Sequence, residues 1–120
     1  MKAVFDTNIL IDYLNGRKEA KDEFALYGTK IISIITYIEV LVGASSSDEE
    51  VVIQELLSTF VIHELSSAIA EKSIMLRKTM GMKVPDAIIY ATARQEGCLL
   101  VSRNTKDFNA DWPDIRTPYK

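Results

Sequence analysis

Three acidic residues, Asp6, Glu39 and Asp86, stand where a strand is expected to end or a helix to begin. Asp6 directly follows a short apolar run, residues 3–5, at the start of the chain. Glu39 is expected in the first turn of the helix after the second strand, and Asp86 follows Pro85 at a helix opening. Ligands of open α/β sheets bind beyond the carboxyl ends of the strands, so Asp6 and Glu39 are expected to face one cleft. Asp86 needs its loop to bring it there.

Carboxylates that lie within a few ångströms of one another repel, and in water they would stay partly protonated. A divalent cation removes this conflict. Oxygen ligands without a neighbouring cysteine or histidine favour Mg²⁺ or Mn²⁺ over zinc. The three acids therefore predict a magnesium or manganese site.

Each acid also has a purely structural interpretation. The segment from Thr36 to Glu39 fits the S/T-x-x-E capping box, in which Glu39 would only secure the start of its own helix. Asp86 after Pro85 is a common helix opening that suits the helix dipole. Asp6 could cap the short helix that follows it. Periodicity alone does not show that the three acids meet.

A fourth polar group, Asn104 and Asp107, follows the last clear strand. Asn104 can cap the turn after it, with Asp107 at the third position of that turn making local hydrogen bonds. Alternatively, one of the two side chains holds the metal ion or its waters. Both interpretations stay open at this point.

Strands alternate with amphipathic segments of helix length, which predicts an α/β fold with a parallel sheet covered on both faces. Strands are expected at residues 3–5, 30–33, 60–64 and 98–102, with an edge strand near 115–117. Helices are expected at residues 9–14, 18–27, 36–42 and 85–97, with a short one after residue 105. Another is expected to start within residues 45–50 and to run to about residue 57, and one capped by Ser66 or Ser67 is expected to reach residue 80.

The 120 residues are expected to form one domain spanning residues 1–120. A net charge of −3 and a pI near 5.1 argue against nucleic-acid binding by general electrostatics, but a local basic rim around an acidic pocket is compatible with them. The single cysteine, Cys98, fits a reducing cytosol. No apolar run is long enough to span a membrane, and Met1 and Lys2 lead directly into a strand, so we expect no signal peptide.

Four segments together resemble the PIN-domain family: VFDTN at 4–8, SIITYIE at 33–39, KVPDAII at 83–89 and SRNTKDF at 102–108. The likeness is greatest to the small VapC-type toxins of toxin–antitoxin modules, and it covers nearly the whole chain. It implies a three-layer α/β/α sandwich around a four- to five-stranded parallel sheet. It also implies a cytoplasmic Mg²⁺- or Mn²⁺-dependent ribonuclease, inhibited by a small antitoxin protein and usually a homodimer.

The resemblance also assigns site residues. Asp6, Glu39 and Asp86 match the acidic metal-binding positions of the family, and Thr7, Asn8 and Thr36 match the small polar positions around them. The sequence departs from the family at Asn104, where many members have an aspartate. Its nearest acid is Asp107, so Asn104 or Asp107 would complete the catalytic site, with one metal ion or two.

Contacts with an RNA substrate need positive charge, because the expected pocket is acidic. Lys83, Arg103 and Lys106 flank the acids and are expected to contact phosphates, although each is also a plausible solvated surface residue. The apolar residues Leu10, Tyr13, Leu14 and Tyr37 are either core or a groove for an antitoxin helix.

Two other functions compete with a ribonuclease. The first is a catalytically inactive PIN-like module that binds RNA or a protein, which the asparagine at position 104 keeps open. The second is a phosphotransfer domain in which Asp6 accepts a phosphoryl group. Such a domain needs a second aspartate two residues later, where this chain has Asn8.

Overall fold

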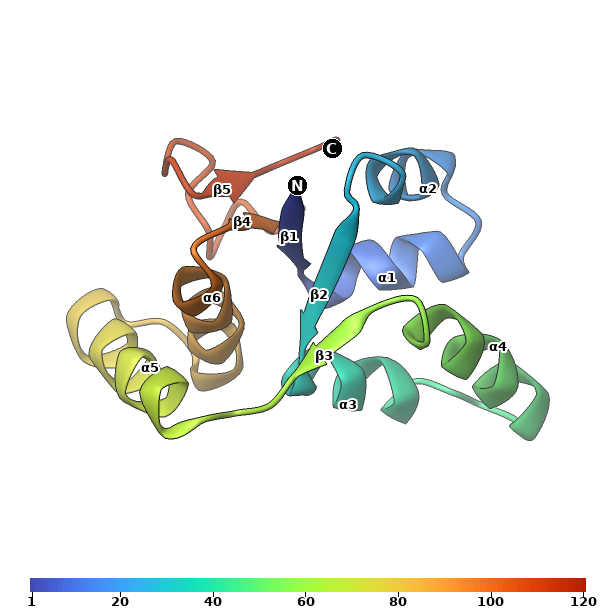
Figure 1. The fold of residues 1–120 in the computed structure, drawn as a ribbon, viewed down its shortest axis with the longest axis horizontal. Coiled ribbons are helices and arrows are strands. Elements are labelled where there is room, and N and C mark those ends of the chain that lie inside the picture. Colours follow the sequence, from blue (N-terminus) through green and yellow to red (C-terminus); the bar gives the residue numbers. More distant parts are fainter.

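Five parallel strands form one sheet at the centre of the computed structural model, which describes residues 1–120 (Figure 1). The strand order is β3-β2-β1-β4-β5, so the first strand lies in the middle. Each pair of neighbours is parallel, as the alternation of strands and helices predicted. The strands are β1 (Lys2–Phe5), β2 (Thr29–Ser33), β3 (Val61–His63), β4 (Leu99–Val101) and β5 (Ile115–Arg116).

Six helices cover the two faces of the sheet and complete the expected α/β/α sandwich (Figure 1). Four of them, α1 to α4, lie on one face, and α5 and α6 lie on the other. The helices are α1 (Thr7–Leu14), α2 (Lys18–Phe24), α3 (Ile34–Val42), α4 (Ser47–Leu57), α5 (Ser67–Met80) and α6 (Val84–Glu96). None of them is both long and apolar enough to cross a membrane.

The central strand β1 is buried on both faces, and its side chains alternate between two cores. Phe5 points toward α1 and α2, where its ring packs edge-on against Phe24 at a centroid distance of 5.0 Å. Val4 points the other way and packs with the residues of α5 and α6. The apolar run at the start of the chain is therefore the axis of the fold, and the residue after it is delivered to the carboxyl edge.

Helix α6 is buried along most of its length, from Ala87 to Ala93. The small side chains that the sequence places in this helix let it lie close to both the sheet and α5. It ends at Gly97, whose φ of 62° is the left-handed conformation that glycine adopts at least cost. Helix α6 thus carries its first turn, with Asp86, to the edge where β1 and β4 end.

Some boundaries differ from the sequence-based expectation. Helix α3 begins at Ile34, and Ser33 is its N-cap, with its hydroxyl accepting a hydrogen bond from the backbone N–H of Ile35. The capping-box interpretation of Thr36 and Glu39 is therefore wrong, and Glu39 lies in the second helical turn instead of the first. Pro85 is the second residue of α6, not the first.

The tail also differs from the expectation. The short helix expected after residue 105 is absent, because residues 104–114 form turns. Asn104 begins the first of these turns, with its backbone oxygen accepting from the N–H of Phe108 at 3.0 Å. The edge strand near residue 115 is present as β5.

Candidate metal-dependent active site

Asp6 lies at the junction of β1 and α1, where the register of the sheet brings two strand ends together. Phe5 pairs with Val101, and the backbone N–H of Asp6 donates to the carbonyl of Val101 at 2.9 Å. Asp6 is extended, with φ −72° and ψ 155°, and it is the N-cap of α1. The capping role proposed from the sequence is therefore confirmed, and the same geometry directs its carboxylate over the carboxyl edge.

Three donors fix the Asp6 carboxylate. Its Oδ1 accepts from the N–H of Thr7 at 2.8 Å, and its Oδ2 accepts from Asn8 Nδ2 at 3.1 Å and from Ser102 Oγ at 2.6 Å. The side chain is only 5% exposed. Burial raises the pKa of Asp6, while the hydrogen bonds from Ser102, Thr7 and Asn8 oppose this rise and the charge of Glu39 adds to it.

Thr7 joins Asp6 to Glu39 across the first and third helices. Its hydroxyl donates to Glu39 Oε1 at 2.7 Å and lies 3.0 Å from the hydroxyl of Thr36. Thr36 is fully buried, whereas Glu39 reaches the exposed side of the edge. Thr7 and Asn8 therefore orient two of the carboxylates, and Thr36 contacts the hydroxyl of Thr7.

Asp86 reaches the same edge from the first turn of α6, half-buried. Its pKa is raised to about 6, first by burial and then by the negative charges of Asp6, Asp107 and Glu39, against the opposing charge of Lys83. No hydrogen bond from the protein is among the causes. The electrostatic influence of the three other acids on Asp86 indicates that their negative charges act on the same edge of the sheet.

Asn104 and Asp107 bond to each other. Asn104 Nδ2 donates to Asp107 Oδ2 at 2.8 Å, and the N–H of Asp107 donates to Asn104 Oδ1 at 3.2 Å. This is the local turn interaction weighed in the sequence analysis. Asp107 nevertheless contributes negative charge to the site, since it acts on the pKa of Asp86.

The three basic residues expected to contact phosphates differ in their surroundings. Lys83 is exposed at the N-cap of α6, beside Asp86, and Lys106 is exposed in the turn after Asn104. Arg103 forms two hydrogen bonds to Asp12, at 2.8 and 2.9 Å. Lys83 and Lys106 thus remain open to solvent, whereas the guanidinium of Arg103 already has a partner.

Sequence reasoning missed two residues, Ser102 and Asp12. Ser102 follows β4 as Asp6 follows β1, so its place after a strand was a usable signal. It is 1% exposed and it bonds to both Asp6 and the N–H of Asn104. Asp12 carries no local signal, because its partner Arg103 is 91 residues away.

The chemical type of the candidate metal ligands, more than the spacing between them, fits a divalent cation. No group of three or more acidic, histidine or cysteine side chains lies together as a finished metal site would require. The edge nevertheless gathers four carboxylates and no soft ligand, and the Asp86 carboxylate has no protein donor. Such an oxygen-only, negatively charged set is what Mg²⁺ or Mn²⁺ binds.

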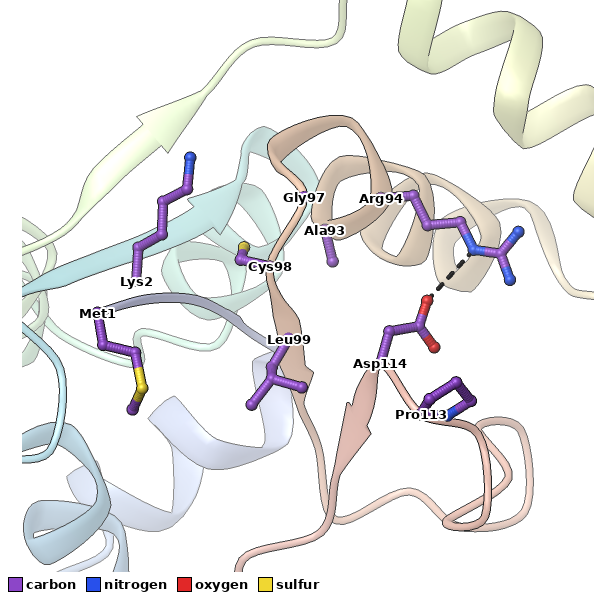
Figure 2. A pocket seen from close by; sticks show the side chains of 9 residues that line it. All are labelled: Met1, Lys2, Ala93, Arg94, Gly97, Cys98, Leu99, Pro113 and Asp114. Atoms are coloured by element: carbon purple, nitrogen blue, oxygen red, sulfur yellow. Dashed lines mark ion pairs between the residues drawn. The ribbon is translucent and has the colours of Figure 1, made fainter.

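A separate hollow of about 550 Å³ lies at the opposite edge of the sheet (Figure 2). Lys2 and Leu99, which begin β1 and β4, lie in its wall, and Arg94 and Asp114 form an ion pair of 3.4 Å on another side of it. None of the proposed acids reaches it. The larger depressions of the surface therefore do not mark the candidate site, which is an open acidic edge.

Comparison with known proteins identifies the family. The model of the PIN domain matches residues 3–110. This chain belongs to the PIN-domain family. A search of curated proteins found no match.

Similar solved structures extend this result. The chain is 48% identical to a chain of a toxin–antitoxin complex from Klebsiella pneumoniae, with 98% of each chain covered and a TM-score of 0.91. It shares the fold of chains in a DNA-bound VapBC from Salmonella typhimurium (23% identity, 97% and 96% covered, TM-score 0.82). VapBC2 from Rickettsia felis, bound to a promoter DNA fragment, is similar at 22% identity, 96% coverage of each chain and a TM-score of 0.80. The VapC-type resemblance expected from the sequence is confirmed.

Proposed function

We propose that this PIN-domain protein is a metal-dependent endoribonuclease and the toxin of a toxin–antitoxin pair. The observation that carries the proposal is the carboxylate of Asp86, whose pKa is raised to about 6 by burial and by neighbouring acids. A carboxylate that the fold holds among other negative charges is an unfavourable arrangement unless a cation neutralises it. The PIN-domain membership and the likeness to a toxin–antitoxin chain support the reaction class.

Asp6, Glu39 and Asp86 would hold Mg²⁺ or Mn²⁺. When bound, such an ion supplies Lewis acidity toward the phosphodiester and lowers the pKa of a coordinated water. Ser102 and Asn8 hold the carboxylate of Asp6 in place, and Thr7 orients that of Glu39. Lys83 and Lys106 are exposed beside the acids and are the side chains best placed to bind RNA phosphates.

The direct test is cleavage of RNA by the purified protein, freed of any partner, with Mn²⁺ present. We expect Asp86→Asn to lower the cleavage rate by about 100-fold or more, the scale of losing one charged contact in a transition state. Lys18→Gln, at an exposed position in α2, serves as the control and should cleave like the wild type. Equal cleavage by the Asp86→Asn protein would reveal a contaminating nuclease and reject the assignment.

The second candidate function is a PIN-like module that binds RNA or protein without cutting. It is favoured by the closed pair of Asn104 and Asp107 and by the lack of a finished three-residue metal site. In the same assay this function predicts RNA retention on a filter without any shortening of the RNA. The two functions are therefore separated by the length of the recovered RNA.

We propose that the antitoxin binds the groove between α1, α2 and α4. Leu10 is fully buried and belongs to the core, and Tyr37 packs against it, whereas Tyr13 and Leu14 line a hollow of about 430 Å³. Its lining carries two lysines, Lys21 and Lys30, and one acid, Glu55, so an apolar helix with a net acidic flank fits best. Leu14→Lys should weaken co-purification of the antitoxin encoded beside this protein, without changing RNA cleavage.

We further propose a cytoplasmic homodimer, because the proposed substrate is cellular RNA and because α5 and α6 expose a group of apolar side chains. Ile74 and Met75 of α5 are exposed, as is Val84 at the start of α6. Ile74 and Val84 also line a hollow of about 310 Å³, together with Leu65 and Ile88. Exposed apolar surface of this kind is typical of protein interfaces. Light scattering should give about twice the chain mass of 13.5 kDa.

A further inference from the structure

Asp12 is a nearly buried carboxylate that ties α1 to the segment after β4. It is 8% exposed, and its two oxygens accept from Arg103 Nε and Nη2 at 2.8 and 2.9 Å. Tyr119 donates its hydroxyl to the same carboxylate at 2.9 Å, and Arg17 lies over the Tyr119 ring at 4.2 Å. A buried carboxylate bound in this way is costly to deprive of its partner, so Arg103 is held firmly.

The backbone of Arg103 runs through the middle of the candidate site. Its N–H donates to Asn8 Oδ1 at 3.2 Å, while Asn8 Nδ2 bonds to the carboxylate of Asp6. Ser102, just before it, donates to Asp6, and Asn104, just after it, bonds to Asp107. The side chain of Arg103 thus anchors a segment that touches two of the four acids.

We propose that Arg103 is a positioning residue, whose ion pair with Asp12 holds segment 102–107 against Asp6, and that it does not contact RNA phosphates. The sequence analysis expected Arg103 to contact phosphates, and the proposal assigns it this other role. The segment forms neither strand nor helix, and beyond Ser102 the ion pair is its one charged attachment to α1, added to the hydrogen bond between the Arg103 N–H and Asn8. The catalytic consequence rests on the proposed ribonuclease function.

The chain contains a matched control for this ion pair. Glu23 of α2 is 4% exposed and accepts two hydrogen bonds from Arg116, at 2.5 and 2.9 Å, and one from the Tyr27 hydroxyl at 2.8 Å. Its hydrogen-bond donors, one arginine and one tyrosine, are of the same kinds as those of Asp12, which also has Arg17 at 3.8 Å. Arg116, however, lies in β5, where strand pairing fixes its backbone: its carbonyl accepts from the N–H of Ser102. Breaking this pair should therefore leave the site in place.

Kinetics of RNA cleavage separate the two roles of Arg103. We expect Asp12→Asn and Arg103→Gln each to lower kcat by roughly 10- to 100-fold, with KM unchanged, because small misplacements of reacting groups have effects of this size. Arg103→Lys should recover only part of the loss, since an ammonium cannot form the two-pronged contact. Glu23→Gln should stay within about twofold of the wild type. If Arg103 instead contacts a phosphate, Arg103→Gln should raise KM and lower by about 1 the slope of log affinity for RNA against log salt concentration, while Asp12→Asn should keep the wild-type kinetics. That result would overturn the proposal.

Hydrogen exchange of the Arg103 and Asn104 amides tests the same proposal without catalysis. Asp12→Asn should accelerate their exchange by about tenfold or more relative to Glu23→Gln, because the segment loses its anchor. Equal exchange in the two variants contradicts the positioning role. If Asp12→Asn does not fold, Tyr119→Phe, which removes one of the three bonds, replaces it. A wild-type protein that cuts no RNA would refute the ribonuclease, and exchange alone would then decide the role of Arg103.

Discussion

Asp6 and Asp86 lie at the same edge of the sheet but differ in burial and in the hydrogen-bond donors around their carboxylates. Asp6 is almost fully buried, yet three donors compensate its charge. Asp86 is more exposed, but it has no such donors, and three acids act on its pKa. The charge that most needs an external cation is therefore that of Asp86.

The raised pKa of Asp86 predicts a dependence of stability on pH in the metal-free protein. The folded state binds a proton up to about pH 6, whereas the unfolded chain releases it near the ordinary value of 3.8. The free energy of unfolding contributed by Asp86 should thus fall as the pH rises from about 4 to about 6 and stay constant above that. We expect roughly 1–2 kcal/mol, because solvent screens a half-exposed group.

Urea denaturation with a chelator present, repeated across this pH range, measures the effect. The difference between wild type and Asp86→Asn reports the titration of Asp86 together with its coupling to the neighbouring acids. Saturating Mn²⁺ should abolish the difference in slope by keeping Asp86 ionised in the folded state. Parallel pH profiles for the two metal-free proteins would be incompatible with the proposed convergence of charge.

At the scale of elements, each acid lies at or near the start of a helix, and the parallel strands place these helix starts at the carboxyl edge of the sheet. The positions of Asp6 and Asp86 could be predicted from the sequence, because an apolar run and a proline mark their elements locally. The start of α3 could not, since Ile34 and Ile35 continue an apolar, β-branched run and conceal the cap at Ser33. The contacts of Ser102 and Asp12 depend on residues more than 90 positions away, which no local pattern encodes.

The ion pair between Glu23 and Arg116 predicts a large effect on stability. Arg116→Ala leaves an almost buried carboxylate without its partner, which should lower the free energy of unfolding by about 3 kcal/mol at pH 7. Lys18→Ala, which removes an exposed ion pair with Asp22, should change it by less than about 0.5 kcal/mol. Urea denaturation monitored by circular dichroism gives both values. Similar losses in the two variants would show that the buried pair is not firmly held.

At the scale of the whole molecule, two separate cores hold the sheet between them, one under α1 to α4 and one under α5 and α6. The layered fold could be predicted from the alternation of strands and helices alone. The acidic edge depends on both halves, since Asp6 and Glu39 come from the first and Asp86 from the second. A cation bound between them would join the two helical layers across the end of the sheet.

The central claim is that Asp6 and Asp86 share one divalent ion, and crystals grown with Mn²⁺ test it most directly. Anomalous scattering locates manganese independently of any assumption about the fold. We predict a manganese peak within bonding distance of carboxylate oxygens from both Asp6 and Asp86, and no such peak in Asp6→Asn crystals. An edge without manganese at saturating concentration, or Asp6 and Asp86 too far apart for one ion and its waters to bridge, would contradict the account.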